Sequence, residues 1–249
     1  MQVLACYNIK GGVGKTATAV NLAYLSAEAG QRTLVWDLDP QGAATFYFRV
    51  KPKRGGSPDK MLAGRRDPRT LIKATDFPDL DLIRARFSFR DLDLAIARAP
   101  KTVRRLRRVI APLAEDYDRL VFDCAPGINL TAESVFHASD ALLVPTIPTP
   151  LSLRTLTQLV GHLERSGPAH LPVLPFFSMV DVRKSMHRAL CESPGLAGVD
   201  FLPTRIPYAS AVERMGIRRA PLFVFANATT PARAYRALWS DVTERLATS

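Results

Sequence analysis

The chain has 249 residues, and its 34 basic residues exceed its 23 acidic ones, which gives a formal net charge of +11 at pH 7. Hydrophobic residues make up 47% of the sequence and charged residues 23%, and these proportions exclude a disordered or fibrous protein. The three cysteines lack metal or redox spacing, and no run approaches the ~20 apolar residues that span a bilayer. Secreted, membrane-spanning and zinc-finger proteins are thus disfavoured. The basic excess favours a polyanionic partner, either nucleic acid or an anionic membrane surface.

Short apolar runs alternate with longer helical stretches along the chain. Strands are predicted at residues 3–8, 33–36, 80–83, 120–123, 141–144, 173–179 and 200–206. Helices are predicted at 16–29, where Gly30 ends the helix, and at 130–137 and 231–247. Apolar strands separated by helices predict an α/β domain, with a mostly parallel twisted sheet covered by helices on both faces. We expect a single domain over 1–249, with a basic loop excursion at about 50–59.

The most specific motif is Lys-Gly-Gly-Val-Gly-Lys-Thr at residues 10–16, between a predicted strand and a predicted helix. Phosphate binding needs backbone N–H groups that point into one concavity, and glycines permit the backbone conformations that this requires. Lys15 is placed to reach the β- and γ-phosphates, and the Thr16 hydroxyl is placed to bind Mg²⁺ directly. The run therefore predicts a P-loop NTPase fold whose nucleotide site is formed by Gly11, Gly12, Val13, Gly14, Lys15, Thr16 and Ala17.

One detail departs from the general P-loop pattern, because Ile9 stands where that pattern has glycine and a second lysine, Lys10, follows it. This arrangement resembles the deviant Walker A motif of the ParA/MinD family of P-loop ATPases. The segments 37–42, 120–126, 178–183 and 205–207 also resemble family segments, so the resemblance covers most of the chain. No additional DNA-binding domain precedes the phosphate loop, and we therefore expect the small ParA type.

The resemblance implies a role for each matching residue. In this family a homodimer sandwiches two ATP molecules, and Lys10 would be the lysine that reaches the partner's nucleotide. Asp39 would position the attacking water, while Asp37 and Asp123 would hold Mg²⁺ through water. Ser178 and Pro207 would lie near the adenine, although ordinary core and loop roles remain open for both.

The resemblance also implies that the ATP-bound dimer binds DNA without sequence preference, and that it positions a chromosome, plasmid or protein cargo. Hydrolysis would be slow until a ParB-like or cargo-adaptor protein stimulates it, and the protein would be cytoplasmic and nucleoid-associated. Basic residues in the C-terminal half match the expected DNA contacts by position: Arg183, Lys184, Arg188, Arg214, Arg218 and Arg219. A competing basic stripe lies on one face of a predicted helix: Lys101, Arg104, Arg105 and Arg108.

Three other functions compete with this interpretation. A MinD-like, membrane-associated ATPase would end in a basic amphipathic helix, but acidic residues balance the basic ones in 231–247, so we expect a core-packing helix there. An electron-transfer ATPase like the nitrogenase iron protein would need paired cysteines, and Cys124 has no second cysteine in a matching position. A nonenzymatic DNA-binding scaffold is disfavoured because the residues of the nucleotide site are all present: Lys10, Lys15, Thr16, Asp39 and Asp123.

Overall fold

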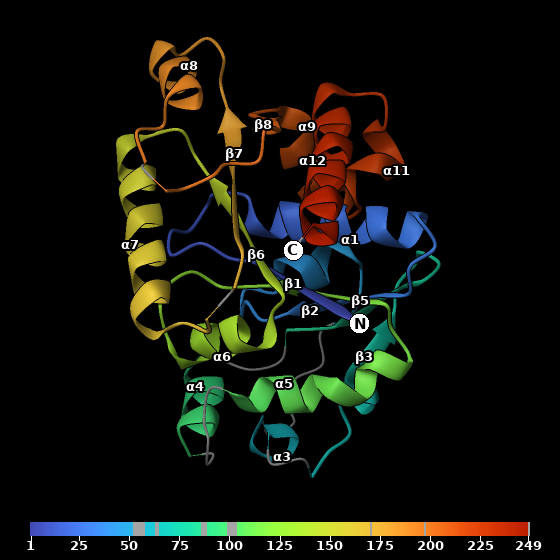
Figure 1. Ribbon diagram of the computed structural model, residues 1–249. Helices are drawn as coiled ribbons and strands as arrows, with labels where there is room; N and C mark the ends of the chain where they lie inside the picture. Colours follow the sequence, from blue (N-terminus) through green and yellow to red (C-terminus); the bar gives the residue numbers. More distant parts are fainter. Residues whose placement is uncertain are drawn as a thin grey trace.

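The computed structural model describes residues 1–51, 58–62, 65–85, 89–98, 104–169, 171–196 and 198–248. Within these ranges the chain forms an eight-stranded sheet with helices on both faces (Figure 1). The strand order is β3-β4-β2-β5-β1-β6-β7-β8, and every neighbouring pair is parallel except β3 and β4. The mostly parallel α/β fold predicted from the sequence is therefore confirmed.

The central strands are buried along almost their whole length, which explains why they are continuous apolar runs rather than alternating ones. The strands are β1 (Gln2–Cys6), β2 (Thr33–Asp37), β3 (Ile72–Ala74), β4 (Leu80–Ile83), β5 (Arg119–Asp123), β6 (Ala141–Thr146), β7 (Val173–Val180) and β8 (Arg205–Pro207). The strand predicted at 200–206 is wrong over most of its length. Leu202 still donates its N–H to the Pro175 carbonyl, but Pro203 has no N–H to continue the ladder, and pairing resumes only at Arg205. The short antiparallel edge strand β3 was not predicted.

Successive side chains of each strand point to opposite faces, and each face has its own hydrophobic cluster. One face is covered by α3 (Pro58–Leu62), α4 (Phe89–Arg98), α5 (Arg105–Ile110), η3 (Ala111–Glu115), α6 (Leu130–Ala138) and α7 (Pro150–Ser166). The other is covered by α1 (Lys15–Glu28), α2 (Ala43–Tyr47), α9 (Ser210–Glu213), α10 (Met215–Arg218), α11 (Leu222–Ala226) and α12 (Thr230–Ala247). Beyond the carboxyl end of β7 lies α8 (Ser185–Glu192) (Figure 1), whose Cys191 packs in a third cluster with Leu153 of α7 and with Phe177 and Val180 of β7.

The first and last helices form as the sequence predicts. Gly30 adopts a left-handed φ of 80° directly after α1 and donates its N–H to the Ala27 carbonyl. In α12, Tyr235, Leu238 and Val242 are buried, so its apolar stripe packs into the core. In the part of the chain that the structure describes, no helix is both long and apolar enough to cross a bilayer.

The basic stretch around residue 105 forms the predicted outward-facing stripe only in part, although the predicted apolar face of Leu106, Ile110 and Leu113 is buried. Lys101 lies outside the described residues, and α5 gives way to the 3-10 segment η3, which contains Pro112. Arg105 is half-buried and donates its Nε–H to the Leu62 carbonyl of α3, whereas Arg104 and Arg108 are exposed. Most of the predicted excursion at 50–59 lies outside the described residues, and at its end Pro58 begins α3.

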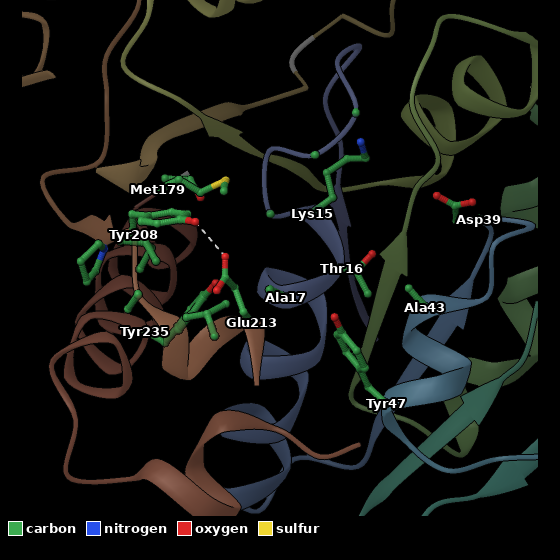
Figure 2. Close-up of a pocket in the computed structure, with 18 of the residues that line it drawn as sticks. Lys15, Thr16, Ala17, Asp39, Ala43, Tyr47, Met179, Tyr208, Glu213 and Tyr235 are labelled. Carbon is green, nitrogen blue, oxygen red and sulfur yellow. Dashed lines mark hydrogen bonds between the residues drawn. The ribbon is translucent and has the colours of Figure 1, made fainter. Parts of the chain in front are cut away.

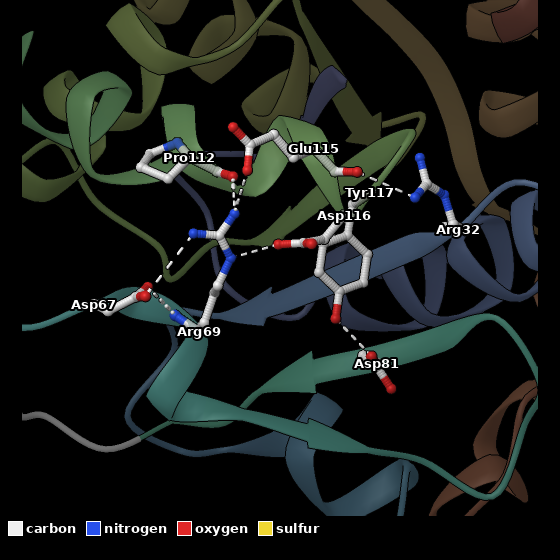
Figure 3. Close-up of polar contacts among 8 residues, drawn as sticks. All are labelled: Arg32, Asp67, Arg69, Asp81, Pro112, Glu115, Asp116 and Tyr117. Carbon is white, nitrogen blue, oxygen red and sulfur yellow. Dashed lines mark hydrogen bonds and ion pairs between the residues drawn. The ribbon is translucent and has the colours of Figure 1, made fainter.

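Polar contacts fasten the β3 edge of the sheet to η3 (Figure 3). Arg69, in the 3-10 segment η1 (Pro68–Leu71), donates to Asp116 at 2.6 Å, to Glu115 at 2.9 Å and to the Pro112 carbonyl at 2.7 Å. The Tyr117 hydroxyl donates to Asp81 of β4 at 2.5 Å. Exposed ion pairs add little stability, so these contacts mainly fix the orientation of the edge.

Candidate functional site

The loop between β1 and α1 lies at the carboxyl edge of the sheet, where ligands gather in open α/β folds. Its ends are pinned to neighbouring strands. Buried Asn8 donates its side-chain amide to the Pro145 carbonyl at 2.9 Å and accepts the Lys10 N–H at 2.8 Å. Gly12 and Gly14 have φ values of 70° and 96°, the left-handed region that favours glycine. The sequence therefore builds a rigid glycine loop that runs directly into the N-terminus of α1.

Lys15 is the first residue of α1, and its side chain is buried. Its ammonium donates to the Lys10 carbonyl at 3.0 Å. Burial lowers the pKa of Lys15, and the nearby carboxylates of Asp123 and Asp39 oppose that shift. A buried cation with a single hydrogen-bond partner is available to an anion in the adjoining cavity.

Asp123 ends β5 and pairs in register with both Cys6 and Asp37. It is completely buried, and neither carboxylate oxygen has a hydrogen-bond partner among the described residues. Burial raises the pKa of Asp123 well above its usual range, the charge of Asp37 raises it further, and the side chain of Thr16 opposes the rise. Buried carboxylates are normally paired or bound to a metal, so this unpartnered group beside a threonine hydroxyl fits a hard divalent cation.

Asp37 and Asp39 have different surroundings, although only one residue separates them. Asp37 is buried and accepts the N–H and hydroxyl of Thr45 at 2.8 and 2.7 Å, and it thereby fixes α2. Its pKa is raised to about 6 by burial, which outweighs these hydrogen bonds. Asp39 is half-buried at the cavity wall, and its Oδ1 accepts the Gln41 N–H at 2.9 Å. Oδ2 of Asp39 has no partner among the described residues and can accept a hydrogen bond from water.

A cavity of about 340 Å³ adjoins the loop. Figure 2 shows Ala43 and Tyr47 of α2 on one side, Tyr208 and Glu213 on the other, and α1 between them. The Tyr208 hydroxyl donates to Glu213 at 2.8 Å. Met179, which has a φ of 56°, closes the same end of the cavity. The lining also includes apolar Ile206, Pro207 and Val212, so a few polar groups lie among apolar ones, as a nucleobase site requires.

The structure brings most of the predicted nucleotide residues together around this cavity. Its lining includes Gly11, Gly12, Gly14, Lys15, Thr16, Ala17, Asp39, Ser178 and Pro207. Val13 does not line it, because its side chain is buried beneath the loop. Lys10 contributes its backbone to the loop, and its side chain has no partner among the described residues, so the predicted reach into a second subunit stays a prediction.

Sequence reasoning missed Tyr47, Met179, Tyr208 and Glu213. Tyr208 directly follows Pro207, so the neighbouring position was a usable signal. No signal pointed to Tyr47, since it reaches the cavity only through the placement of α2.

Comparisons with known proteins agree with this geometry. Residues 1–167, more than half of the chain, match the AAA domain family. Over 161 residues the chain is 32% identical to the sporulation initiation inhibitor protein Soj of Bacillus subtilis, a match that covers 64% of each protein. Over 164 residues it is 33% identical to the chromosome partitioning protein ParA of Myxococcus xanthus, a match that covers 66% of the chain and 58% of that ParA. The chain belongs to the ParA/MinD family.

The matched part of this ParA/MinD-family chain spans about three fifths of the length of these relatives. The structural similarity covers more of the chain than the sequence matches do. The septum site-determining protein MinD of Pyrococcus horikoshii, solved in complex with Mg-ADP, is 21% identical and superposes with a TM-score of 0.79 over 98% of the chain and 96% of that structure. The family fold thus extends through the C-terminal third.

The predicted DNA contacts form two separate groups on this family fold. In the first, Arg183 donates to both oxygens of Asp181 at 2.9 Å, and Arg188 donates to the Val182 carbonyl at 2.6 Å, while Lys184 is exposed. In the second, Arg214 and Arg218 are exposed on α10 and its N-cap, whereas Arg219 lies 4.5 Å above the Phe46 ring. Arg214, Arg218 and Lys184 are therefore the side chains most free to meet phosphates.

Proposed function

We propose that this chain binds ATP and Mg²⁺ in the cavity and hydrolyses ATP slowly, and that the nucleotide controls dimerisation and nonspecific DNA binding. The observation that carries the proposal is the fully buried, unpartnered Asp123 carboxylate beside Thr16, at the foot of a glycine loop. The Mg-ADP complex of the Pyrococcus horikoshii MinD and the partitioning role named for the Myxococcus xanthus ParA support it.

Each residue of the site has its own role in ATP hydrolysis. The loop N–H groups and Lys15 bind the phosphates, and Asp39 orients the attacking water through its free Oδ2. Lys10 of the partner subunit supplies a further cation to the charge that develops on the transferred phosphoryl group. Thr16 would hold Mg²⁺ directly and Asp123 would hold it through water, and the ion would neutralise charge on the phosphate oxygens. Asp37 keeps α2 and the Asp39 loop in place.

The DNA-bound state would serve to position a chromosome, plasmid or protein cargo. The net charge of +11 and the exposed Arg214, Arg218 and Lys184 support this part. In the described residues nothing resembles an element that enters a DNA groove, so contacts to phosphates alone are proposed. A ParB-like or cargo-adaptor protein would stimulate hydrolysis and release the dimer.

The test is retention on nonspecific DNA with ATP, with ADP and without nucleotide, over a salt series. Retention should require ATP and fall steeply with salt. The double variant R214E/R218E should weaken it, and should flatten the slope of log K against log salt by about 0.9 for each phosphate that is no longer neutralised. The double variant R154E/R165E, which reverses two exposed arginines of α7 and changes the net charge by the same amount, serves as the matched control. Equal retention with ATP and ADP, or equal weakening in both variants, would remove the DNA part of the proposal.

A parallel series on anionic liposomes tests the membrane alternative. Because α12 buries Tyr235, Leu238 and Val242 in the core, its apolar stripe is not available to a bilayer in this conformation. We expect no ATP-dependent retention on liposomes. Retention on liposomes together with release from DNA would reverse the assignment.

A further inference from the structure

Two segments far apart in the sequence hold each other beside the nucleotide cavity. Arg49, which follows α2, donates its Nε–H to the Arg219 carbonyl and its Nη2–H to the Arg218 carbonyl, both at 3.0 Å. In return, Arg219 donates its Nε–H to the Phe46 carbonyl at 3.1 Å, and its guanidinium stacks over the Phe46 ring. We call these contacts between Arg49, Phe46, Arg218 and Arg219 the clasp.

The backbone at the clasp is unusual on both sides. Arg49 has a φ of 57° and Arg219 a φ of 50°, so both adopt the left-handed conformation that is unfavourable for a residue other than glycine. Such residues persist only where surrounding contacts impose them, and they are typical of switch regions and ligand clamps. Each of these two arginines is held by hydrogen bonds to the opposite segment, so the two strained conformations depend on one another.

The clasp joins the two walls of the nucleotide cavity. On the α2 side, Ala43 and Tyr47 line the cavity, and Asp37 fixes the helix through Thr45. On the other side, Val212 and Glu213 line the cavity immediately before Arg214 (Figure 2). Anything that changes the spacing of the two walls must therefore stretch or release the clasp.

The same clasp sets the position of residues 214–219. The Arg218 and Arg219 carbonyls are held by Arg49, and the N–H groups of these residues donate to the Arg214 and Met215 carbonyls. The exposed side chains of Arg214 and Arg218 project from this short helical turn. The direction in which these two side chains point depends on the conformation of the turn, and the hydrogen bonds from Arg49 hold that conformation.

We propose that Arg49 is a positioning residue that couples the nucleotide in the cavity to the presentation of Arg214 and Arg218. The coupling rests on the nucleotide-binding part of the proposed function, and the use of those arginines against DNA rests on its DNA-binding part as well. Coupling between two sites is reciprocal, so DNA should change nucleotide affinity by the same factor by which the nucleotide changes DNA affinity.

The test measures amide hydrogen exchange at Arg218 and Arg219 in the full chain without nucleotide, with ADP and with a nonhydrolysable ATP analogue. The wild-type protein should show exchange rates at these amides that differ by about 5-fold or more between the ADP and analogue states. In R49Q the exchange rates of these two amides should no longer differ between the ADP and analogue states. Retention on DNA should also become nearly independent of the nucleotide: retention with the analogue and with ADP should agree within about 2-fold in R49Q, and should differ about 5-fold or more in the wild type.

Two further variants separate geometry from charge. R49K keeps the positive charge but lacks the planar fork that reaches two carbonyls, so it should behave like R49Q. D76N removes only the ion pair of 3.6 Å between Asp76 and Arg49, and should behave like the wild type. The coupling would be overturned if R49Q or R49K behaved like the wild type. It would also be overturned if the exchange rates in the wild-type protein did not depend on the nucleotide. Nucleotide-dependent exchange without any DNA retention in the wild type would instead overturn the DNA proposal and leave the coupling in place.

Discussion

Gly14 is the position at which the loop tolerates a side chain least. Its φ of 96° lies in the left-handed region, and a Cβ atom there would stand 2.9 Å from the Ser178 hydroxyl oxygen. Ser178 is 1% exposed and therefore has little room to move. The left-handed conformation alone costs alanine about 1–2 kcal/mol, and overpacking a buried site typically costs about 1–3 kcal/mol. We expect Gly14→Ala to lower the free energy of unfolding by about 3 kcal/mol.

The loop provides its own controls for this prediction. Gly12 has a φ of 70°, but a Cβ atom there would meet nothing within 4 Å, and Gly11 has neither a left-handed φ nor a neighbour within that distance. Gly12→Ala should therefore cost about 1 kcal/mol, and Gly11→Ala less than about 0.5 kcal/mol. Urea unfolding of the three nucleotide-free variants measures the series.

A double-mutant cycle with Ser178→Ala, which removes the hydroxyl oxygen, separates the steric cost of Gly14→Ala from its conformational cost. The double variant should recover the steric contribution and retain the conformational one. If Gly14→Ala proves no more costly than Gly12→Ala, the close approach of the loop to β7 is wrong. If Gly12→Ala matches Gly11→Ala, the conformational argument fails.

Four more predictions concern the carboxylates and Lys10. Asp123→Asn removes a buried carboxyl group whose ionisation the folded state disfavours, so at pH 8 it should raise the unfolding free energy of the nucleotide-free protein by about 1 kcal/mol or more, while Mg²⁺-dependent nucleotide retention is lost. Burial raises the pKa of Asp37 and of Asp123 above the unfolded value of about 4, so their folded forms hold protons that the unfolded chain releases. Wild-type stability should therefore be greatest below about pH 4 as far as these groups contribute, and should fall as the pH rises through 6, the folded value of Asp37. Urea titrations from pH 4 to pH 8 should show a smaller fall in Asp123→Asn, and parallel curves would contradict the assignment. Asp39→Ala should keep nucleotide affinity but slow hydrolysis about 100-fold or more in a phosphate-release assay, and a normal rate would exclude it as the water-positioning residue. Lys10→Ala should bind nucleotide and fail to turn over, whereas unchanged turnover would remove the exchange of lysines between subunits.

Features that depend on residues close together in the sequence could be predicted, whereas those that depend on contacts between distant segments could not. The glycine loop, the strands β1, β2 and β5 and the helix α1 are local patterns, and they form within one or two residues of the predicted bounds. The contact between Asp37 and Thr45 was not accessible from the sequence, because the Asp37 carboxylate accepts both the N–H and the hydroxyl of a residue eight positions away, in the first turn of α2. The predicted place of Asp37 near Mg²⁺ stays a prediction.

Long-range contacts explain most of the remaining differences. Arg49 and Arg219 are 170 positions apart, and nothing in either segment indicates the other. Arg105 fits a solvent-facing helical stripe by its spacing, yet the carbonyl of Leu62 on a different helix draws it inward. The basic residues near the C-terminus show the same limit, since pairing with Asp181 or stacking on Phe46 decides which charges remain available.

The two margins of the sheet are both short. At one margin β3 runs antiparallel for three residues and exposes Lys73, and at the other β8 is three residues long, exposes Arg205 and pairs irregularly with β7. Unpaired backbone at such a margin is what templates the growth of fibrils, and brevity together with a lysine or arginine blocks it. Copies of this molecule can therefore lie close together at high concentration without hydrogen bonding to one another along the edges of their sheets.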